Sequence, residues 1–304
     1  MTSRTSQRKR KAAAASKRRS PKGKQKRSRG GSRLGFFAVF AVGVVVLAMV
    51  GLSVYNHVKT PPTPGASARD RVVRAVTSVP AAALDAVGAG SGVSQPSVLP
   101  AGTPPLTQSG KPEILYIGAE YCPFCAAERW PMAIALSRFG TFSGVGLTTS
   151  SSTDVYPSTP TLTFHGSTYT SDLISFAPIE TETNQLSATG LGYRSLDAPS
   201  APEQQLMQTY DSPPYVTSAG SIPFILLGNR YVISGSSYRP DVLQHKTWQQ
   251  VASALSGPSS PIAEQVLGTA NMLTAAICQL TGGQPSNVCT SSGVSVAASA
   301  LPAP

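Results

Sequence analysis

The residues best suited to chemistry are four cysteines, which their spacing divides into two pairs. Cys122 and Cys125 enclose only Pro123 and Phe124, and they follow a short apolar run, residues 114–118, that is typical of a buried strand. A helical pattern begins at once, so the Cys-Pro-Phe-Cys sequence stands where a strand passes into a helix. Side chains three residues apart on a helix lie close together, so the two sulfurs can form a disulfide.

The position of Cys122 at the start of this helix favours its thiolate form. The helix dipole and the free backbone N–H groups both stabilise negative charge there. Because the thiolate is the attacking species in thiol–disulfide exchange, Cys122 is the expected nucleophile and Cys125 the resolving thiol. We therefore expect Cys122 to be the more exposed of the two and to have the lower pKa.

Three other interpretations of this pair remain open. It could be a structural disulfide, although a bond across two residues constrains the chain little. It could be half of a zinc site, although the other two cysteines are separated by ten residues and no histidine is close in sequence. It could bind copper, with His165 or His245 brought near by the fold. We predict no metal site and no cofactor.

A proline that is distant in sequence supports the redox interpretation. Thioredoxin-like folds place a cis-proline opposite the Cys-x-x-Cys, at the start of a strand that leads into a hairpin. Ile222 and Pro223 precede an apolar strand of this kind. We expect Pro223 to be cis and in contact with the Cys122 sulfur, the alternative being an ordinary trans proline at a strand start.

The elements expected around these residues follow the order of a thioredoxin-like α/β fold with an inserted β-hairpin region. The strand and helix at the cysteines are followed by a strand, the inserted hairpin, a helix, two paired strands and two helices. These correspond to residues 145–148, 161–176, 202–210, 222–227 with 231–234, 240–255 and 261–280. The whole domain is expected over residues 111–290.

The chain before this domain indicates a membrane. Residues 1–33 contain 14 basic and no acidic side chains, so the net charge of +11 belongs to this tail. The next 22 residues, from Leu34 to Tyr55, carry no charge and would span about 33 Å as a helix, close to the ~30 Å hydrocarbon core of a bilayer. We expect one transmembrane helix that is an uncleaved signal anchor, in preference to a cleaved signal peptide or a long core helix.

The charge asymmetry across this segment sets the expected orientation in the cell membrane. Under the positive-inside rule the basic tail would be cytoplasmic and the cysteine domain extracytoplasmic. The tail would lie near anionic lipid headgroups, and nucleic acid is not expected as a partner. Residues 56–110 are interpreted as a linker with a possible short helix at 68–87, broken at Pro80. Residues 291–304 are expected to be disordered.

Cys278 and Cys289 fit a structural role. Cys278 falls near the end of the last long helix, and a turn rich in Gly and Pro brings the chain back. In an oxidising compartment a disulfide between the two would fix the C-terminal segment, by about 3 kcal/mol for a loop of this size. The alternative is a second redox pair that exchanges electrons with Cys122 and Cys125.

A longer stretch of sequence carries a family resemblance. It consists of Tyr-Ile-Gly-Ala-Glu-Tyr-Cys-Pro-Phe-Cys-Ala-Ala-Glu-Arg-Trp at 116–130, Ser-Arg-Phe-Gly-Thr-Phe at 137–142 and Tyr-Pro-Ser-Thr-Pro-Thr at 156–161. On these motifs, residues 70–290 resemble domain-of-unknown-function family 929. The resemblance implies a membrane-anchored, thioredoxin-like protein with a redox role, and it implies no particular substrate.

Three features differ from thioredoxin itself. Tyr121 stands where thioredoxin has Trp, the dipeptide between the cysteines is Pro-Phe, and Tyr116 replaces an acid six residues before the first cysteine. Proton transfer to or from Cys125 would therefore use Glu120, Glu128 or water, although either carboxylate could equally be a solvated surface group. The expected neighbours of the active site are Glu120, Tyr121, Pro123, Phe124, Glu128 and Ile222.

The sequence thus predicts an extracytoplasmic, membrane-anchored thiol–disulfide oxidoreductase. Its clients would be protein thiols and disulfides, which it would engage through a mixed disulfide at Cys122, and no residue identifies the membrane redox partner that recycles it. The alternatives are a non-enzymatic thioredoxin-like binding or assembly module with a structural cysteine pair, and a metal chaperone.

Overall fold

The computed structural model describes residues 65–303. The basic tail, the apolar segment 34–55 and the start of the expected linker lie outside the described residues, so the membrane anchor and its orientation stay predictions. No helix within residues 65–303 is long and apolar enough to cross a membrane. All four cysteines lie in the described part of the chain.

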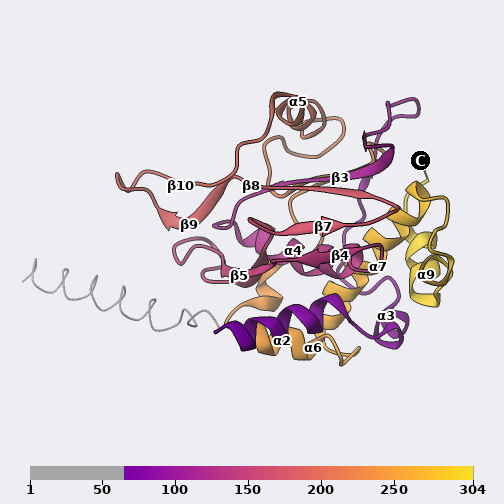
Figure 1. The fold of residues 1–304 in the computed structure, drawn as a ribbon, viewed down its shortest axis with the longest axis horizontal. Helices are drawn as coiled ribbons and strands as arrows, with labels where there is room; N and C mark the ends of the chain where they lie inside the picture. The colour runs from indigo at the N-terminus through magenta and orange to yellow at the C-terminus, as the bar shows by residue number, and fades with distance from the viewer. Residues whose placement is uncertain (1–64, 304) are drawn as a thin grey trace, which may run out of the picture. The chain divides into compact units, whose positions relative to one another are not determined.

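A mixed sheet of six strands lies at the centre of the fold (Figure 1). Its strands are β1 (Ser97–Val98), β2 (Thr107–Gln108), β3 (Lys111–Gly118), β8 (Ser175–Glu180), β11 (Phe224–Leu227) and β12 (Tyr231–Ser234). Strand β3 pairs in parallel with β8 and antiparallel with β11, which in turn pairs antiparallel with β12. This confirms the hairpin expected between β11 and β12, whose turn places Gly228 and Asn229 at positive φ.

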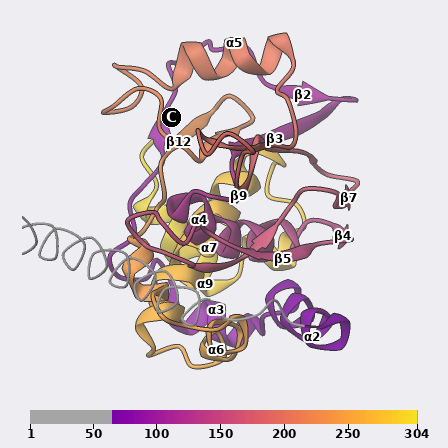
Figure 2. The same ribbon diagram turned by 90° about the vertical axis from the view of Figure 1, so that its left-hand side faces the viewer.

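Alternation along β3 divides the interior into two cores. Ile114 and Tyr116 face a large core that includes helices α4 (Pro123–Leu136) and α7 (Pro261–Leu280). Leu115 and Ile117 face a smaller core that takes in α5 (Ala201–Tyr210). Figure 2 shows α5 on one side of the sheet and α4 and α7 on the other. The expected α/β class is therefore confirmed.

The strand that follows the cysteine helix differs from the expectation. Residues 145–148 correspond to β5 (Gly146–Thr149), which pairs with β6 (Pro160–Thr163) outside the central sheet. The parallel partner of β3 is β8, so the β–α–β unit is β3–α4–β8. Strand β8 contains Pro178, and its only pairing within residues 65–303 is with β3, which is the edge position where a strand tolerates proline.

The hairpin expected at 161–176 is also wrong, because its expected strands at 161–164 and 169–176 do not pair with each other. Strand β6 pairs with β5, β7 (Thr168–Thr170) pairs with β4 (Thr141–Ser143), and the last residues of the range enter β8. A separate hairpin of β9 (Glu182–Leu186) and β10 (Tyr193–Ser195) projects from the end of β8 (Figure 1). Alternation indicates that a strand exists, whereas its partner is set by packing between distant segments.

The segment interpreted as a linker is part of the domain from residue 66 onward. Helices α2 (Ala66–Thr77) and α3 (Ala81–Val87) confirm a helical segment broken at Pro80. Both helices bury apolar side chains in the large core, namely Val72, Val76, Ala83 and Leu84. This burial needs the complementary surface of α6 (Trp248–Ala254) and α7, which lie far along the chain.

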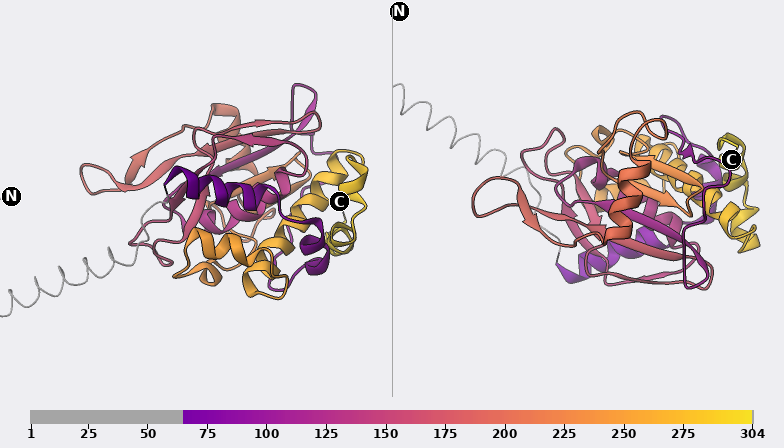
Figure 3. Two further views of the ribbon diagram at one scale, coloured as in Figure 1. Left: turned by 60° about the horizontal axis from the view of Figure 1, so that its bottom comes forward. Right: turned by 90° about the horizontal axis from the view of Figure 1, so that it is seen from above.

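The disorder expected for residues 291–304 is also wrong. Helix α9 (Ser292–Ala300) follows the short α8 (Ser286–Cys289) and buries Val294 and Ala297 against α7. Gly293 permits this packing, because a Cβ on it would lie 2.5 Å from the carbonyl oxygen of Leu84. Figure 3 shows this C-terminal helix, in yellow, beside α3.

The remaining helices match the expectation in part. Helices α5 and α7 confirm those expected at 202–210 and 261–280. The single helix expected at 240–255 is divided into a 3₁₀ turn, η1 (Pro240–Leu243), and α6 (Trp248–Ala254). The division occurs because Thr247 caps α6, its hydroxyl accepting a hydrogen bond from the Gln250 N–H at 3.2 Å.

Candidate functional site

The two cysteines of the Cys-Pro-Phe-Cys sequence lie at the amino end of α4. Cys122 is the N-cap residue, and its sulfur accepts a hydrogen bond from the Cys125 N–H at 3.4 Å. Pro123 occupies the first helical turn, where its missing N–H costs no helical bond. Both cysteines are free thiols, Cys122 being 5% exposed and Cys125 fully buried. This confirms that Cys122 is the more accessible of the two.

The two thiols also differ in acidity. A hydrogen bond from the Cys125 side chain, with help from the backbone N–H groups of Cys125 and Phe124, lowers the pKa of Cys122 despite its burial. Burial raises the pKa of Cys125 well above its usual range, and the neighbouring Cys122 raises it further. The expected order of acidity is therefore confirmed, with Cys122 the thiol that ionises first.

The segment that leads into β11, including Ile222 and Pro223, reaches the same point from a distant part of the sequence. The Ile222–Pro223 peptide bond is cis, as expected. The Cys122 thiol donates a hydrogen bond to the Ile222 carbonyl oxygen at 3.5 Å. Two segments that are 100 residues apart are thus joined at the sulfur of the expected nucleophile.

Aromatic side chains surround the two cysteines. Phe124 is 37% exposed and makes an edge-to-face contact with Tyr156, their ring centroids being 5.9 Å apart. Tyr121 stacks on Tyr193 of the β9–β10 hairpin at 4.2 Å, and burial raises the pKa of Tyr121 to about 12. The contact with Tyr156 holds the exposed ring of Phe124, which lies between the two cysteines in the sequence.

Two hollows lie beside this sequence and share Ser94 and Ser236. The smaller, of about 270 Å³, is lined by Gly92, Ser94, Phe124, Gly235, Ser236, Tyr238 and Arg239. The larger, of about 340 Å³, is lined by Ser94, Gln95, Ser97, Val216, Thr217, Ser218, Ser221, Val232, Ile233, Ser234, Ser236 and Ser237. The two hollows together form a surface rich in hydroxyl groups next to Phe124.

The two carboxylates considered for proton transfer occupy different environments. Glu120 is partly exposed, and its N–H donates to the Glu182 carbonyl oxygen at 2.8 Å. Glu128 is fully buried and accepts hydrogen bonds from the Ser237 N–H at 2.8 Å and the Ser237 hydroxyl at 2.9 Å. Burial raises the pKa of Glu128 to about 7. The alternative that Glu128 is a solvated surface group is therefore wrong.

Pro131 allows a hydrogen bond between α4 and the loop after β12. Pro131 has no N–H, so the Ala127 carbonyl oxygen lacks its helical donor and accepts the Tyr238 hydroxyl at 2.7 Å instead. Tyr238 follows Ser237 directly, so two consecutive residues of the loop after β12 are bound to α4. The cysteine helix and the wall of the hollows are thereby connected.

Sequence reasoning missed a buried ion pair beneath the dithiol. Arg129 and Glu180 are both fully buried, and the guanidinium binds the carboxylate through Nε at 2.7 Å and Nη2 at 2.6 Å. Arg129 lies four residues after Cys125, a helical spacing that could have indicated its proximity. Glu180 lies at the end of β8, and no local pattern in the sequence connects it to the cysteines.

The two histidines considered as metal ligands are placed otherwise. His165 pairs with Asp197, Nδ1 lying 3.0 Å from a carboxylate oxygen, and the hydrogen bond to Asp197 raises the pKa of His165. His245 follows η1 in a loop and has positive φ. Within residues 65–303, no group of three or more His, Cys, Asp or Glu side chains is arranged to hold a metal ion.

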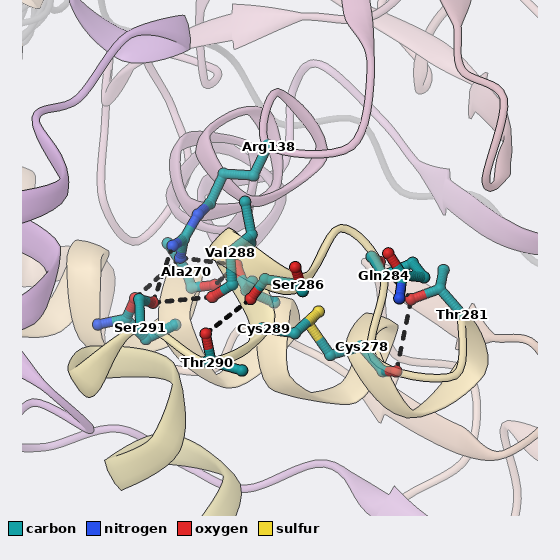
Figure 4. The surroundings of a disulfide bond; sticks show 12 residues. Arg138, Ala270, Cys278, Thr281, Gln284, Ser286, Val288, Cys289, Thr290 and Ser291 are labelled. Carbon is teal, nitrogen blue, oxygen red and sulfur yellow. Dashed lines mark hydrogen bonds between the residues drawn. A yellow bond between two sulfur atoms is a disulfide. The ribbon is translucent and has the colours of Figure 1, made fainter.

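The second cysteine pair is a disulfide. Cys278 on α7 is bonded to Cys289 on α8, with the Cα atoms 5.6 Å apart. Figure 4 shows the bond beside Arg138, whose guanidinium donates to Asn271, Thr274 and Ser291. The bond thus joins α7 to the C-terminal segment, and the structural role expected of it is consistent with this position.

Comparison with known proteins yields one match. The family model described as "Domain of unknown function (DUF929)" matches residues 100–279, which is more than half of the chain and contains the dithiol, Pro223, Arg129 and Glu180. Neither the curated proteins nor the solved structures compared with the chain gave a match. The chain therefore belongs to the DUF929 family.

Proposed function

We propose that this protein is a thiol–disulfide oxidoreductase with a thioredoxin-like domain. The strand order supports the fold assignment: β8 runs parallel to β3, and β11 and β12 follow antiparallel. Helices α4 and α7 cover one face of this sheet and α5 covers the other. In this arrangement β4 to β7, together with the β9–β10 hairpin, are additions to the thioredoxin-like core.

The observation that carries the proposal is the contact between Cys122 and the segment before Pro223. The Cys122 thiol lies 3.5 Å from the Ile222 carbonyl oxygen, at the amino end of a helix that lowers its pKa. A structural disulfide would need neither an acidic thiol nor a buried, less acidic partner. The unequal pair is the arrangement that exchange chemistry requires.

The exchange proceeds in two steps. The Cys122 thiolate attacks one sulfur of a client disulfide, forms a mixed disulfide and releases the other client sulfur as a thiolate, which takes up a proton. Cys125 then loses its proton and attacks the Cys122 sulfur, and the second client sulfur leaves and is protonated. The client disulfide is reduced to two thiols, and Cys122 and Cys125 are oxidised to a disulfide; the reverse sequence oxidises a client.

The client is a polypeptide that lies across the dithiol in this proposal. Pro223 has no N–H, so the adjoining backbone can pair with an extended client chain without an unpaired donor of its own. Phe124 provides an apolar contact, and the adjoining serine-rich hollows provide hydroxyl groups. The setting we propose is extracytoplasmic, with residues 34–55 as membrane anchor and a membrane redox partner that recycles the dithiol.

The test uses the full-length protein and a peptide containing one disulfide. We expect wild-type protein to reduce the peptide, Cys122→Ser to be inactive, and Cys125→Ser to accumulate a mixed disulfide visible by mass. Retained exchange in Cys122→Ser would contradict the assigned nucleophile. A wild-type dithiol that stays oxidised at potentials above about −300 mV and exchanges with no peptide would indicate the binding-module alternative.

A further inference from the structure

We propose that Arg129 is a positioning residue that holds positive charge beneath both cysteines and stabilises their thiolate forms. The proposal rests on the thiol–disulfide function proposed above, and it assigns to Arg129 electrostatic stabilisation of the thiolates, not the proton transfer that the sequence analysis sought in a carboxylate. Its basis is the position of the guanidinium on the cysteine helix, its three hydrogen bonds, and one buried arm without a partner.

The helix places Arg129 on the same face as the two thiols. It lies seven residues after Cys122 and four after Cys125, spacings that return to one face of an α-helix. The side chain is fully buried, as is Glu180, which binds it through two parallel hydrogen bonds. This two-point contact prevents the guanidinium from rotating or moving toward solvent.

A third hydrogen bond connects the guanidinium to the backbone at the dithiol. Arg129 Nη2 donates to the Ala119 carbonyl oxygen at 2.7 Å, and the Cys122 N–H donates to the same oxygen at 3.3 Å. The backbone of Ala119 also hydrogen-bonds Cys125 and lowers its pKa. Arg129 thus binds the carbonyl oxygen of Ala119, whose backbone contacts both cysteines.

Two buried polar atoms beside this pair have no hydrogen-bond partner in the described residues. They are Nη1 of Arg129 and the hydroxyl of Tyr116, whose ring centroid lies 5.9 Å from the guanidinium carbon. A buried donor without a partner is costly, so its presence needs an explanation. An arm of the guanidinium that is left unoccupied in the reduced protein can respond to charge that forms on a thiol.

The positive charge of the ion pair influences the pKa of the two thiols more than its negative charge does. Burial, the main influence on Cys125, raises its pKa, whereas the positive charge of Arg129 lowers it and also lowers that of Cys122. Arg129 remains charged, because Glu180 and Tyr116 counteract the effect of burial and raise its pKa well above its usual range. In a medium of low polarity such a fixed charge acts strongly over short distances.

The step that benefits most is the second one of the exchange. Cys125 must become a thiolate inside the protein before it attacks the mixed disulfide, and its proton finally resides on the departing client thiol. Arg129 cannot accept that proton, since it is already a cation. It lowers the free energy of the buried Cys125 thiolate, so that Cys125 loses its proton more readily although position 116 holds Tyr and not an acidic residue.

The test measures how the alkylation rate of Cys122 by iodoacetamide depends on pH. Replacing the pair together, Arg129→Met with Glu180→Gln, removes the charge without leaving a buried ion unpaired. We expect the midpoint to rise by about one pH unit, equivalent to a tenfold loss of thiolate well below the midpoint. Resolution of a mixed disulfide at Cys122 should slow by a similar factor and recover at higher pH.

Two further variants separate charge from shape. Glu180→Gln alone leaves Arg129 charged and removes the opposing carboxylate, so the midpoint should fall, which also tests the proposal if the double variant does not fold. Arg129→Lys should keep the midpoint near that of wild type while lowering the melting temperature. Arg138→Met is the control for loss of a partly buried arginine and should leave the midpoint unchanged.

An unchanged midpoint in Glu180→Gln, or in the double variant where it folds, would overturn the proposal and leave Arg129 with a structural role only. This outcome is distinguishable from failure of the proposed function. Alkylation reports the acidity of Cys122 whether or not the protein exchanges disulfides with peptides, whereas the peptide assay on wild type tests the function itself.

Discussion

The two cysteine pairs lie on neighbouring helices of one core, yet they have opposite surroundings. Cys122 caps the amino end of α4, where the helix dipole is positive, whereas Cys278 lies two residues before the carboxyl end of α7, where it is negative. The first pair is free and lies above a buried ion pair, and the second is a disulfide between two helices. Under the proposed function, helix position and nearby charge, rather than proximity of two cysteines, distinguish the reactive pair from the stabilising one.

Exchange activity should separate the pairs most strongly. Cys122→Ser removes the thiolate at the helix start, so peptide-disulfide reduction should fall to background. Replacing both Cys278 and Cys289 with serine should leave that activity largely intact in the folded protein. The measurement is the reduction rate of the peptide at a temperature where both variants are folded. A large loss of activity in the second variant without loss of stability would indicate that this pair relays electrons.

Stability should show the reverse order. Loss of the Cys278–Cys289 bond releases the constraint between α7 and α8, at a cost of about 3 kcal/mol in the free energy of unfolding for a short loop. Thermal unfolding of the double serine variant should therefore begin with α9. Cys125→Ser should change the free energy of unfolding much less, which denaturant unfolding of both variants will show. Equal destabilisation by both would contradict the division of roles.

Glu128, a buried carboxyl on the cysteine helix, should make the free energy of unfolding depend on pH. The pKa of Glu128 is raised from 4.5 to about 7 by burial, so the folded protein holds a proton that the unfolded chain releases near pH 4.5. The resulting stability is fully present below pH 4.5 and decreases as the pH rises to 7. Glu128→Gln should remove this decrease and raise the free energy of unfolding above pH 7 by about 1–3 kcal/mol.

Ser237 provides the matched variant for this prediction. Its hydroxyl and N–H both donate to Glu128 and favour the charged form. Ser237→Ala removes the hydroxyl, so the pKa of Glu128 should rise further and the decrease in stability should extend to higher pH. Urea unfolding at a series of pH values measures both variants. A curve for Glu128→Gln with the same slope as wild type would show that another group causes the dependence.

The smallest effect is expected at the exposed ring beside the dithiol. Phe124 is an exposed large apolar side chain between the two cysteines, and Phe124→Ala should raise KM for a peptide disulfide roughly threefold, the scale of a partly buried contact. Exchange with a small disulfide such as oxidised dithiothreitol should not change. Val296→Ala is the control, since Val296 is also exposed but lies on α9. An equal increase in KM for Val296→Ala would show that the effect is not specific to Phe124.

The local part of the site follows from neighbouring residues in the sequence. A buried strand followed by Cys-Pro-Phe-Cys and a helix specifies which thiol caps the helix and is therefore the more acidic, because capping depends only on neighbouring residues. The turn at Gly228 and Asn229 specifies the β11–β12 hairpin for the same reason. The bonded state of Cys278 and Cys289 was predictable from their spacing and the turn between them.

The pairings between distant segments depend on how the whole chain packs. Strand β3 pairs with β8 and not with β5, although β5 and β8 are both short. The choice depends on which of the two strands packs against α4 and the sheet. The same holds for α9, whose few apolar residues favour order only once α3 and α7 cover them. Glu180 reaches Arg129 through the parallel pairing of β8 with β3. The position of Arg129 on the cysteine helix follows from local spacing. Its pairing with Glu180 depends on sheet topology, since a single sequence indicates strands without their partners.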